Sequence, residues 1–217
     1  MKNYEKDPKL GYELSAELKR LGIDNPIKAD MDQEVVSKSV HSLLSALGIA
    51  CDDESIQKTP ARVARFFTDE LFYGLSYDNF PKITFNHNSY GYTEPVISRN
   101  ISFKSTCEHH LVTISGNAFV AYMPKDRVIG LSKINRVVDF FARRPQVQER
   151  ATLQIFHALK YILQTDDIAV MIRATHHCIT MRGVSDQNVD NITYQFGGSF
   201  SESLMKKEFL DLAKDTK

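Results

Sequence analysis

Two short windows of the sequence hold most of the side chains that could bind a metal ion. They contain two of the three cysteines and four of the seven histidines, namely Cys107, His109 and His110 in the first window and His176, His177 and Cys178 in the second. Cys107 and His110 are three residues apart, so one turn of chain can direct a thiolate sulfur and an imidazole nitrogen at the same ion. Cys178 can supply a third ligand from a distant segment. The spacing therefore predicts a metal site.

A set of two cysteines and one histidine favours zinc, and three protein ligands leave a fourth position open for water. An open position is typical of catalytic zinc, and a further histidine beside it can transfer protons near neutral pH. The same windows also allow a closed, structural site in which His109, His176 or His177 is the fourth ligand. The spacing alone leaves both interpretations open.

The sheet that must carry these windows is predicted from short runs rich in β-forming residues. We expect strands at 83–85, 96–103 and 111–122, with a turn or bulge at 115–117. Cys107 to His110 then fall in a connection between two strands, where functional residues are commonly placed. A later strand from 168 to 181 would direct His176, Cys178 and Arg182 to one face, and a last strand is expected at 192–196.

Apolar residues at helical spacing predict helices at both ends of the chain. The clearest stripe, which Gly48 ends, consists of Val36, Val40, Leu43, Leu44 and Leu47. Before it, residues 1–30 are polar and weakly patterned, and we expect one short helix there, between residues 12 and 21. An amphipathic helix from 202 to 213 follows the last strand. The chain therefore alternates helical and β-rich regions.

Two further helices each carry a pair of cations. The first has Thr59 as its cap and Pro60 in its first turn, and Ser132 can cap the second. The cations are Arg62 and Arg65 on the first helix and Lys133 and Arg136 on the second. Lys133 and Arg136 lie near the positive end of their helix, where a bound anion is favoured, although a solvated pair explains them equally well. Arg62 and Arg65 are three residues apart on the surface of their helix, and such a pair is usually only a solvated face.

Pro145 is expected to open another helix, with a buried face made of Val147, Ala151, Ile155, Ala158 and Ile162. Gln148 and Glu149 lie in its first turn, away from that face. A glutamate in the first turn is sufficiently explained by the helix dipole, so the pattern alone gives it no functional role.

The composition gives no support for nucleic-acid or membrane partners, and we expect neither. Acidic and basic residues number 27 each, so no overall field attracts nucleic acid or an anionic membrane. No apolar run approaches the length of a membrane span, and the first six residues lack the apolar stretch of a signal peptide. Since two of three cysteines resemble ligands, we expect a reducing cytoplasm and an ordinary, partly buried Cys51.

Four short sequence motifs lie between residues 105 and 183. They are Ser-Thr-Cys-Glu-His-His at 105–110, Gly-Leu-Ser-Lys-Ile-Asn-Arg at 130–136, Arg-Pro-Gln-Val-Gln-Glu-Arg at 144–150, and His176-x-Cys178 with Arg182-Gly183. Together with Thr-Pro-x-Arg-Val-Ala at 59–64, they resemble the GTP cyclohydrolase I family over roughly residues 30 to 210. The match of several separate blocks is far more specific than any one motif.

The resemblance implies an α+β protein with the tunnelling fold. In this fold an antiparallel four-stranded sheet with helices on one face assembles into β-barrel rings, here preceded by an N-terminal helical region. The implied division is an N-terminal extension at 1–30, a helical region at 31–75 and a catalytic domain at 76–217. Family members are homodecamers of two face-to-face pentamers, with active sites at subunit interfaces. Their reaction converts GTP and water to 7,8-dihydroneopterin triphosphate and formate, the first step of folate or tetrahydrobiopterin synthesis.

The resemblance also implies a role for individual residues. The Zn²⁺ ligands would be Cys107, His110 and Cys178. The catalytic residues would be His176, which protonates guanine N7 before water attacks C8, His109, which assists ring opening, and Ser132, which lies near the sugar. The substrate-binding residues would be Glu149, which recognises guanine, and Gln148, together with Lys133, Arg136, Arg182, Arg62 and Arg65 for the triphosphate.

The sequence departs from the family in two places. Residues 185–191 lack the serine- and threonine-rich run of many members, and Ala151 replaces a larger aliphatic residue. These changes affect loop shape and packing, since neither position is a proposed ligand or acid/base. Alternative functions are a zinc-stabilised purine- or pterin-binding module without turnover, a relative that acts on another purine or pterin, and a structural scaffold around a buried metal.

Overall fold

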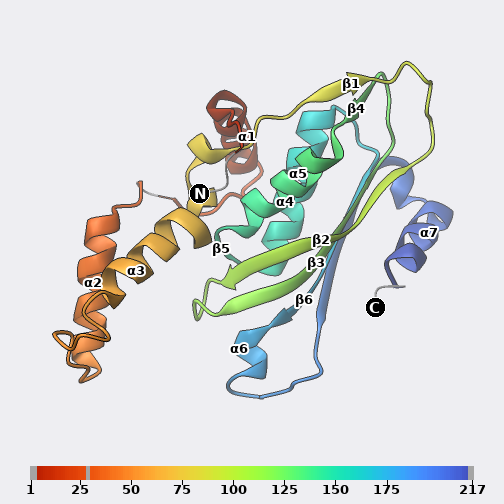
Figure 1. Cartoon of the computed structure of the whole chain (residues 1–217). Coiled ribbons are helices and arrows are strands. Elements are labelled where there is room, and N and C mark those ends of the chain that lie inside the picture. Colours follow the sequence, from red (N-terminus) through yellow and green to blue (C-terminus); the bar gives the residue numbers. More distant parts are fainter. Residues whose placement is uncertain (1–3, 28–29, 215–217) are drawn as a thin grey trace.

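The computed structural model describes residues 4–27 and 30–214 and has an α+β architecture (Figure 1). Residues 1–3 and 28–29 of the predicted extension lie outside this described part. Within it, the main sheet has the strand order β5-β2-β3-β6-β7. The strands are β2 (Val96–Cys107), β3 (Thr113–Tyr122), β5 (Pro145–Gln146), β6 (Ile168–His176) and β7 (Asn191–Phe196). β2, β3, β6 and β7 form the predicted antiparallel unit, and the short β5 pairs in parallel with the end of β2.

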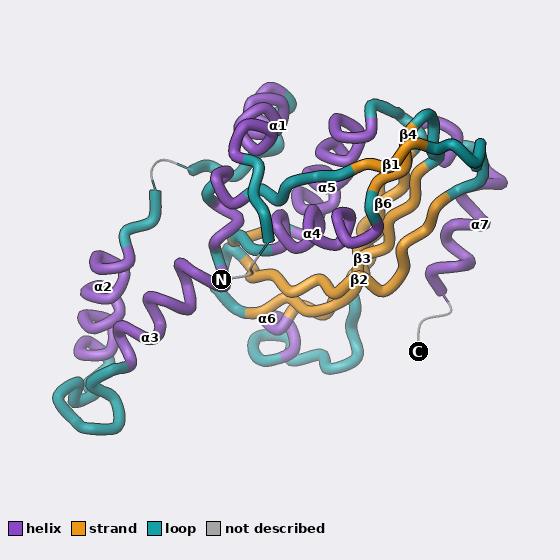
Figure 2. The backbone as a smooth tube through the Cα atoms, turned by 45° about the horizontal axis from the view of Figure 1, so that its top comes forward, coloured by secondary structure: helices purple, strands orange, loops and turns teal. Residues whose placement is uncertain are grey.

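Two long helices, α4 (Leu131–Ala142) and α5 (Gln148–Leu163), cover one face of this sheet (Figures 1 and 2). Alternate strand residues such as Ile114, Ala118 and Val120 are fully buried beneath them, together with Val137 of α4 and Ile155 of α5. Because strand side chains alternate between faces, one set of residues builds this main core. A separate two-stranded pair of β1 (Phe85–His87) and β4 (Arg127–Ile129) precedes α4.

The opposite face of the sheet is covered in part by α7 (Ser203–Lys214). Phe209 and Ala213 of α7 are buried against Phe119, Ala121 and neighbouring strand residues in a second core. The expectation of helices on one face only is therefore corrected. The physical reason is that Phe119 and Ala121 give the second face its own apolar area, which α7 removes from water.

The predicted turn at 115–117 is absent, since β3 is paired continuously with β6 through these residues. A Cβ atom at Gly116 would lie 2.1 Å from the backbone oxygen of Arg173. The glycine thus allows two strands to approach closely, which is a common reason for glycine inside a strand. The irregularity in the sheet lies instead in β2 between Ser98 and Ile101, where Asn100 has a φ of 57°.

The N-terminal segment packs against the main core. Its helix α1 (Pro8–Arg20) begins four residues earlier than expected, because the Asp7 side chain caps it by accepting from the backbone of Leu10. Leu14 and Leu18 of α1 are fully buried in the same core as the sheet and α4. A helix was expected in this region, but its weak apolar pattern did not indicate that the helix contributes to the core.

Arg144 joins this segment to the rest of the chain. Its fully buried guanidinium lies 3.2 Å from Asp24 Oδ1 and 3.3 Å from Asn25 Oδ1, and it stacks among the rings of Tyr77, Phe140 and Phe141. Asn25 also donates to the backbone oxygen of Pro145 at 2.9 Å and accepts from Gln154 at 2.9 Å. A buried charge requires polar or charged partners, and here the carboxylate partner, Asp24, lies 120 residues before Arg144 in the sequence.

Helices α2 (Gln33–Ala46) and α3 (Thr59–Arg65) pack against each other and project from the sheet (Figures 1 and 2). Gly48 follows α2 with a φ of 81°, which confirms the predicted helix end. The apolar stripe of α2 is only partly covered, because Leu43 and Leu47 remain 58% and 67% exposed. Thr59 is the first residue of α3 and does not cap it, so that prediction is wrong.

Two other predicted helix starts are also wrong. α4 begins at Leu131 after Gly130 without a capping side chain, which puts Ser132 inside its first turn. Pro145 belongs to β5, and α5 begins at Gln148. Gln148 and Glu149 nevertheless occupy the first turn of α5 as predicted. Among the described helices, none is long and apolar enough to span a membrane.

Candidate metal centre and active site

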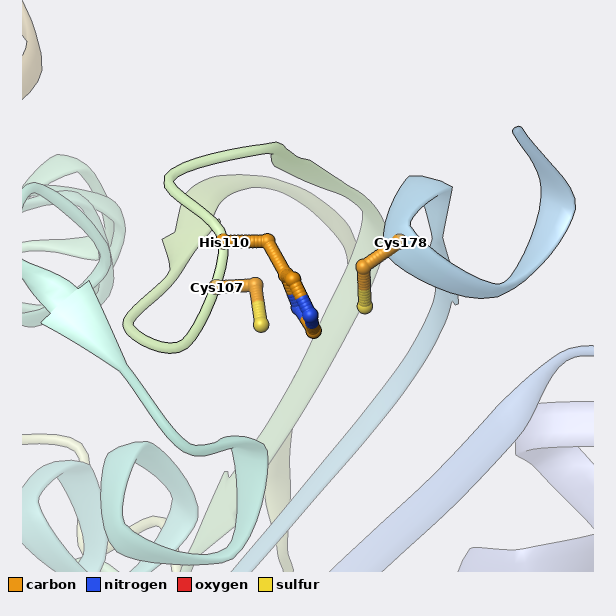
Figure 3. Close-up of side chains that lie close together, drawn as sticks. All are labelled: Cys107, His110 and Cys178. Carbon is orange, nitrogen blue, oxygen red and sulfur yellow. The ribbon is translucent and has the colours of Figure 1, made fainter. Parts of the chain in front are cut away.

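The side chains of Cys107, His110 and Cys178 converge at one end of the sheet (Figure 3). Cys107 is the last residue of β2, His110 lies in the turn that follows, and Cys178 lies in the short helix α6 (His177–Thr180). One sulfur or ring nitrogen from each residue lies within 4.8 Å of those of the other two. Two sulfurs and one imidazole nitrogen at this separation fit the donor set that zinc prefers.

The route by which Cys178 reaches this cluster differs from the predicted one. β6 ends at His176, and the chain then turns into α6 instead of continuing as a strand to residue 181. The alternation that was to place His176, Cys178 and Arg182 on one face therefore does not apply. The helical turn still directs Cys178 towards Cys107 and His110, so its predicted proximity is confirmed.

The turn that carries His110 is held by both backbone and side-chain contacts. The backbone N–H of Cys107 donates to the oxygen of Val112 at 2.8 Å, and that of Leu111 donates to the oxygen of Cys107 at 2.8 Å. Glu108 donates its N–H to the backbone oxygen of Gln146 at 3.1 Å, and its carboxylate forms an ion pair with Arg150. This support could not be predicted from spacing, because Glu108 and Arg150 are 42 positions apart in the sequence.

The other histidines do not join the three-residue group within the described chain. His109 is exposed, with Nδ1 3.7 Å from the sulfur of Cys107. His177 instead contacts the Ser115 hydroxyl through Nε2 at 3.1 Å. Arg182 lies beside the group, where Nη1 donates to Nε2 of His110 at 2.9 Å. Three donors are the number that leaves one position open on a four-coordinate zinc ion, and His109 lies close beside the group.

His176 occupies the end of β6, next to the first turn of α5. Its Nε2 lies 2.7 Å from Oε1 of Gln148. Burial lowers the pKa of His176 below its ordinary value, while the negative charge of Glu149 acts in the opposite direction. The charge coupling indicates that Glu149, which is exposed, lies near His176. An imidazole and an exposed carboxylate are thus available together at this end of the sheet.

The electrostatics of the thiols depend strongly on whether a cation is bound. Burial raises the pKa of the Cys178 thiol, and the hydrogen bond to Cys107 and the charge of Cys107 act in the same direction. A bound metal ion acts oppositely, because the thiolate is the form that coordinates. Metal binding at this pair therefore releases protons, as is general for thiolate sites.

Other predicted site residues lie far from this cluster in the single chain. The N–H of Ile129 donates to the Tyr122 hydroxyl at 3.2 Å, and Tyr122 pairs with Val96 at the opposite end of β2 from Cys107. α4 therefore begins at that far end and runs towards β5, over about 18 Å for its 12 residues. Ser132, Lys133 and Arg136 lie in its first half. The guanidinium of Arg136 lies 5.0 Å from the ring centre of Tyr4.

Arg62 and Arg65 are also separate from the cluster. Both are exposed on α3, which packs against α2 and projects outward from the sheet (Figures 1 and 2). The single chain thus brings the predicted ligands together with His109, His176, Gln148, Glu149 and Arg182, but it leaves the cations of α3 and α4 elsewhere.

A sulfur- and imidazole-lined site at the end of an antiparallel sheet, beside helices on its face, defines an α+β protein with side chains that could hold a metal ion. Comparison with known sequences gives the class a specific identity. Residues 36–214 match the model of the family "GTP cyclohydrolase I", and the chain belongs to this family.

Several relatives support this membership over nearly their whole length. The chain is 47% identical to GTP cyclohydrolase 1 of Haemophilus influenzae (strain PittEE), covering 87% of this chain and 89% of that protein. It is 46% identical to GTP cyclohydrolase 1 of Vibrio cholerae, covering 89% and 92%. It is 49% identical to that of Actinobacillus pleuropneumoniae serotype 5b, covering 88% and 90%.

Proposed function

We propose that this protein is a zinc-dependent GTP cyclohydrolase I, which hydrolyses GTP at C8 of guanine to 7,8-dihydroneopterin triphosphate and formate. The observation that carries the proposal is the convergence of Cys107, His110 and Cys178 beside His176 and Glu149, in a chain of this family. We further propose that the enzyme works in the cytoplasm and that its product enters pterin synthesis.

Cys107, His110 and Cys178 would hold Zn²⁺. When bound, zinc supplies Lewis-acid chemistry that makes a water molecule nucleophilic near neutral pH. The chain's own task is to bring purine C8 to this place. Glu149 accepts from guanine N1–H and the 2-amino group together, a paired contact that adenine does not offer. Glu149 lies in the first turn of α5, so it orients the base beside His176.

The proton transfers are assigned to the two histidines near the metal ligands. His176 donates a proton to guanine N7, which makes C8 electrophilic. His109, adjacent to the ligand turn and exposed, assists proton transfer while the imidazole ring of the base opens and formate is released. Ser132 assists the later rearrangement of the ribose.

The separation within one chain supports an active site shared between subunits. Ser132 must act on the ribose of the same nucleoside whose C8 reacts beside the metal ligands. In one chain it lies at the other end of α4, about one helix length away. We therefore assign Ser132, Lys133 and Arg136 to a neighbouring copy in a homo-oligomer, with Arg62, Arg65 and Arg182 as further triphosphate ligands. The proposed assembly is the decamer of two pentameric rings.

The test is to incubate the zinc-loaded protein with GTP and to measure dihydroneopterin triphosphate and formate by mass spectrometry. Equal amounts of both products are expected. Formate without the pterin would assign the zinc and histidine steps to this protein but not the rearrangement, and would direct attention to Ser132. Neither product from protein with confirmed zinc would contradict the proposal and favour a binding module without turnover.

A further inference from the structure

The carboxamide of Gln148 is buried in the first turn of α5, and its polar atoms all have partners. Gln148 is only 2% exposed. Its Nε2 donates to the backbone oxygens of Ile172 at 3.2 Å and Asn191 at 3.0 Å, and lies 3.1 Å from the hydroxyl of Thr193. Its Oε1 lies 2.7 Å from Nε2 of His176. The amide therefore connects the β6–β7 pair to the ring of His176.

These contacts determine which way the amide faces. A backbone carbonyl oxygen can only accept a hydrogen bond, so the group directed at Ile172 and Asn191 must be the NH₂. The oxygen then faces His176, and an amide oxygen can only accept. Nε2 of His176 must consequently carry a proton in order to donate to it. The contacts on the far side of Gln148 thus fix the tautomer of the histidine.

We propose that Gln148 is a positioning residue that fixes the ring of His176 and keeps a proton on its Nε2. Nδ1 is then the atom of His176 that exchanges a proton with the substrate. This role replaces the substrate contact expected for Gln148, because its amide is buried and both its nitrogen and its oxygen have partners inside the protein. The consequence for turnover rests on the proposed function, whereas the tautomer is a property of the chain itself.

The first measurement therefore needs no substrate. Zinc-loaded protein labelled with ¹⁵N-histidine is studied by solid-state NMR, and the His176 signals are identified by their loss in His176→Ala. The expected result is a His176 ring that carries a proton on Nε2, whether or not Nδ1 carries a second one. A ring in the unmodified protein whose Nε2 lacks a proton would overturn the proposal, whether or not the protein acts on GTP.

The second measurement separates positioning from substrate binding. Gln148→Met keeps a similar volume but removes the acceptor for His176. We expect kcat for GTP to fall about 10- to 100-fold, with KM unchanged within about twofold and with mixed tautomers of His176. A guanine ligand would instead raise KM. A raised KM with unchanged kcat, or no change in either constant, would overturn the proposal.

Thr152→Val is the matched control. The Thr152 hydroxyl donates to the backbone oxygen of Gln148 at 2.9 Å and lies 2.6 Å from the hydroxyl of Thr193. Neither of these contacts involves His176. This variant loosens the same contact between α5 and β7 and should retain both kcat and the Nε2 tautomer. Zinc content and Tm are measured for both variants. If Thr152→Val lowers kcat as much as Gln148→Met does, general loosening explains the effect and the proposal is wrong.

Discussion

The carboxylate of Glu108 is paired with the guanidinium of Arg150, which joins the metal-binding turn to the first turn of α5. Arg150 also donates to Oε1 of Gln146 at 3.2 Å and to the backbone oxygen of Pro145 at 3.3 Å. Glu108 follows Cys107 directly, so the position of this cysteine depends on contacts outside its own turn. Ligands held in place before the metal arrives lose less freedom on binding it.

Replacing Arg150 with methionine should weaken metal binding. The apolar side chain keeps much of the packing but leaves Glu108 without its cation, so the turn loses its support. We expect about 10- to 100-fold lower zinc affinity in a competition titration with a chelator. Lys160→Met on the same helix removes an exposed pair with Asp166 and should leave zinc affinity unchanged. Equal affinities of the Arg150 variant and the unmodified protein would contradict the role of the pair.

Serine at the cysteine ligands should abolish both zinc retention and turnover. The hydroxyl of serine stays protonated at neutral pH and is a poor zinc ligand, so Cys107→Ser and Cys178→Ser should each contain substoichiometric zinc by elemental analysis. Cys51→Ser is the matched control, since Cys51 lies in a loop near Ser45, away from the cluster. A Cys178→Ser variant with full zinc content would remove this residue from the ligand set.

Glu149→Gln should lose guanine recognition while it retains zinc. The amide keeps the shape of glutamate but can no longer accept two hydrogen bonds from the base as an anion. We expect kcat/KM for GTP to fall by about 100-fold, as two bonds to a charged acceptor suggest. Inosine triphosphate, which lacks the 2-amino group, supplies the comparison. In the variant the preference for GTP over this analogue should largely disappear, and an unchanged preference would assign guanine recognition elsewhere.

Mixing two inactive variants should restore activity if the site is shared between copies. Ser132→Ala lacks a residue of α4, and His176→Ala lacks one at the other end of the sheet. When the two variants are coexpressed and assemble at random, roughly a quarter of the shared sites should contain both intact side chains. Rates of pterin formation by the mixed and the separate variants provide the measurement. No recovery from assemblies shown to be mixed would place Ser132 and His176 in the site of one chain.

Alanine at Gly116 should destabilise the sheet. The added methyl group would meet the backbone oxygen of Arg173 at 2.1 Å, so β3 and β6 would have to separate locally. We expect the free energy of unfolding to fall by about 1–3 kcal/mol in urea titrations at fixed protein concentration. Asn117→Ala, at an exposed neighbouring position, should change it by less than about 0.5 kcal/mol. Equal stabilities of the two variants would remove the steric argument.

Local patterns predicted much of this fold because they reflect physical constraints that act along the chain. Strands in the regions of β2, β3, β6 and β7 and the end of α2 at Gly48 were predicted from residue type and spacing, whereas the antiparallel four-stranded arrangement was implied by the family resemblance. The cluster of Cys107, His110 and Cys178 was predicted from ligand chemistry, even though the route to Cys178 was wrong. Residue types that bind metals are few, so their clustering is informative without exact geometry.

Contacts between distant segments were not predictable in the same way. Leu14 and Leu18 lie in a polar, weakly patterned region, and only the sheet and α4 make them core residues. The stripe of α2 shows the opposite, since Leu43 and Leu47 have helical spacing but stay exposed in the single chain. Whether an apolar helix face is buried depends on the segment that packs against it, and the local sequence of the helix does not identify that segment.

The buried contact between Arg144 and Asp24 also indicates that the folded unit extends beyond the residues that match the family model. The family match begins at residue 36, so Asp24 and Asn25 lie before it, while Arg144 lies within it. A chain shortened to the matched residues would keep the buried guanidinium and lose its carboxylate. Leaving one member of such a pair uncompensated costs about 3–5 kcal/mol. That loss is a large share of the stability of a typical domain, so a chain truncated at the boundary of the family match is expected to be much less stable.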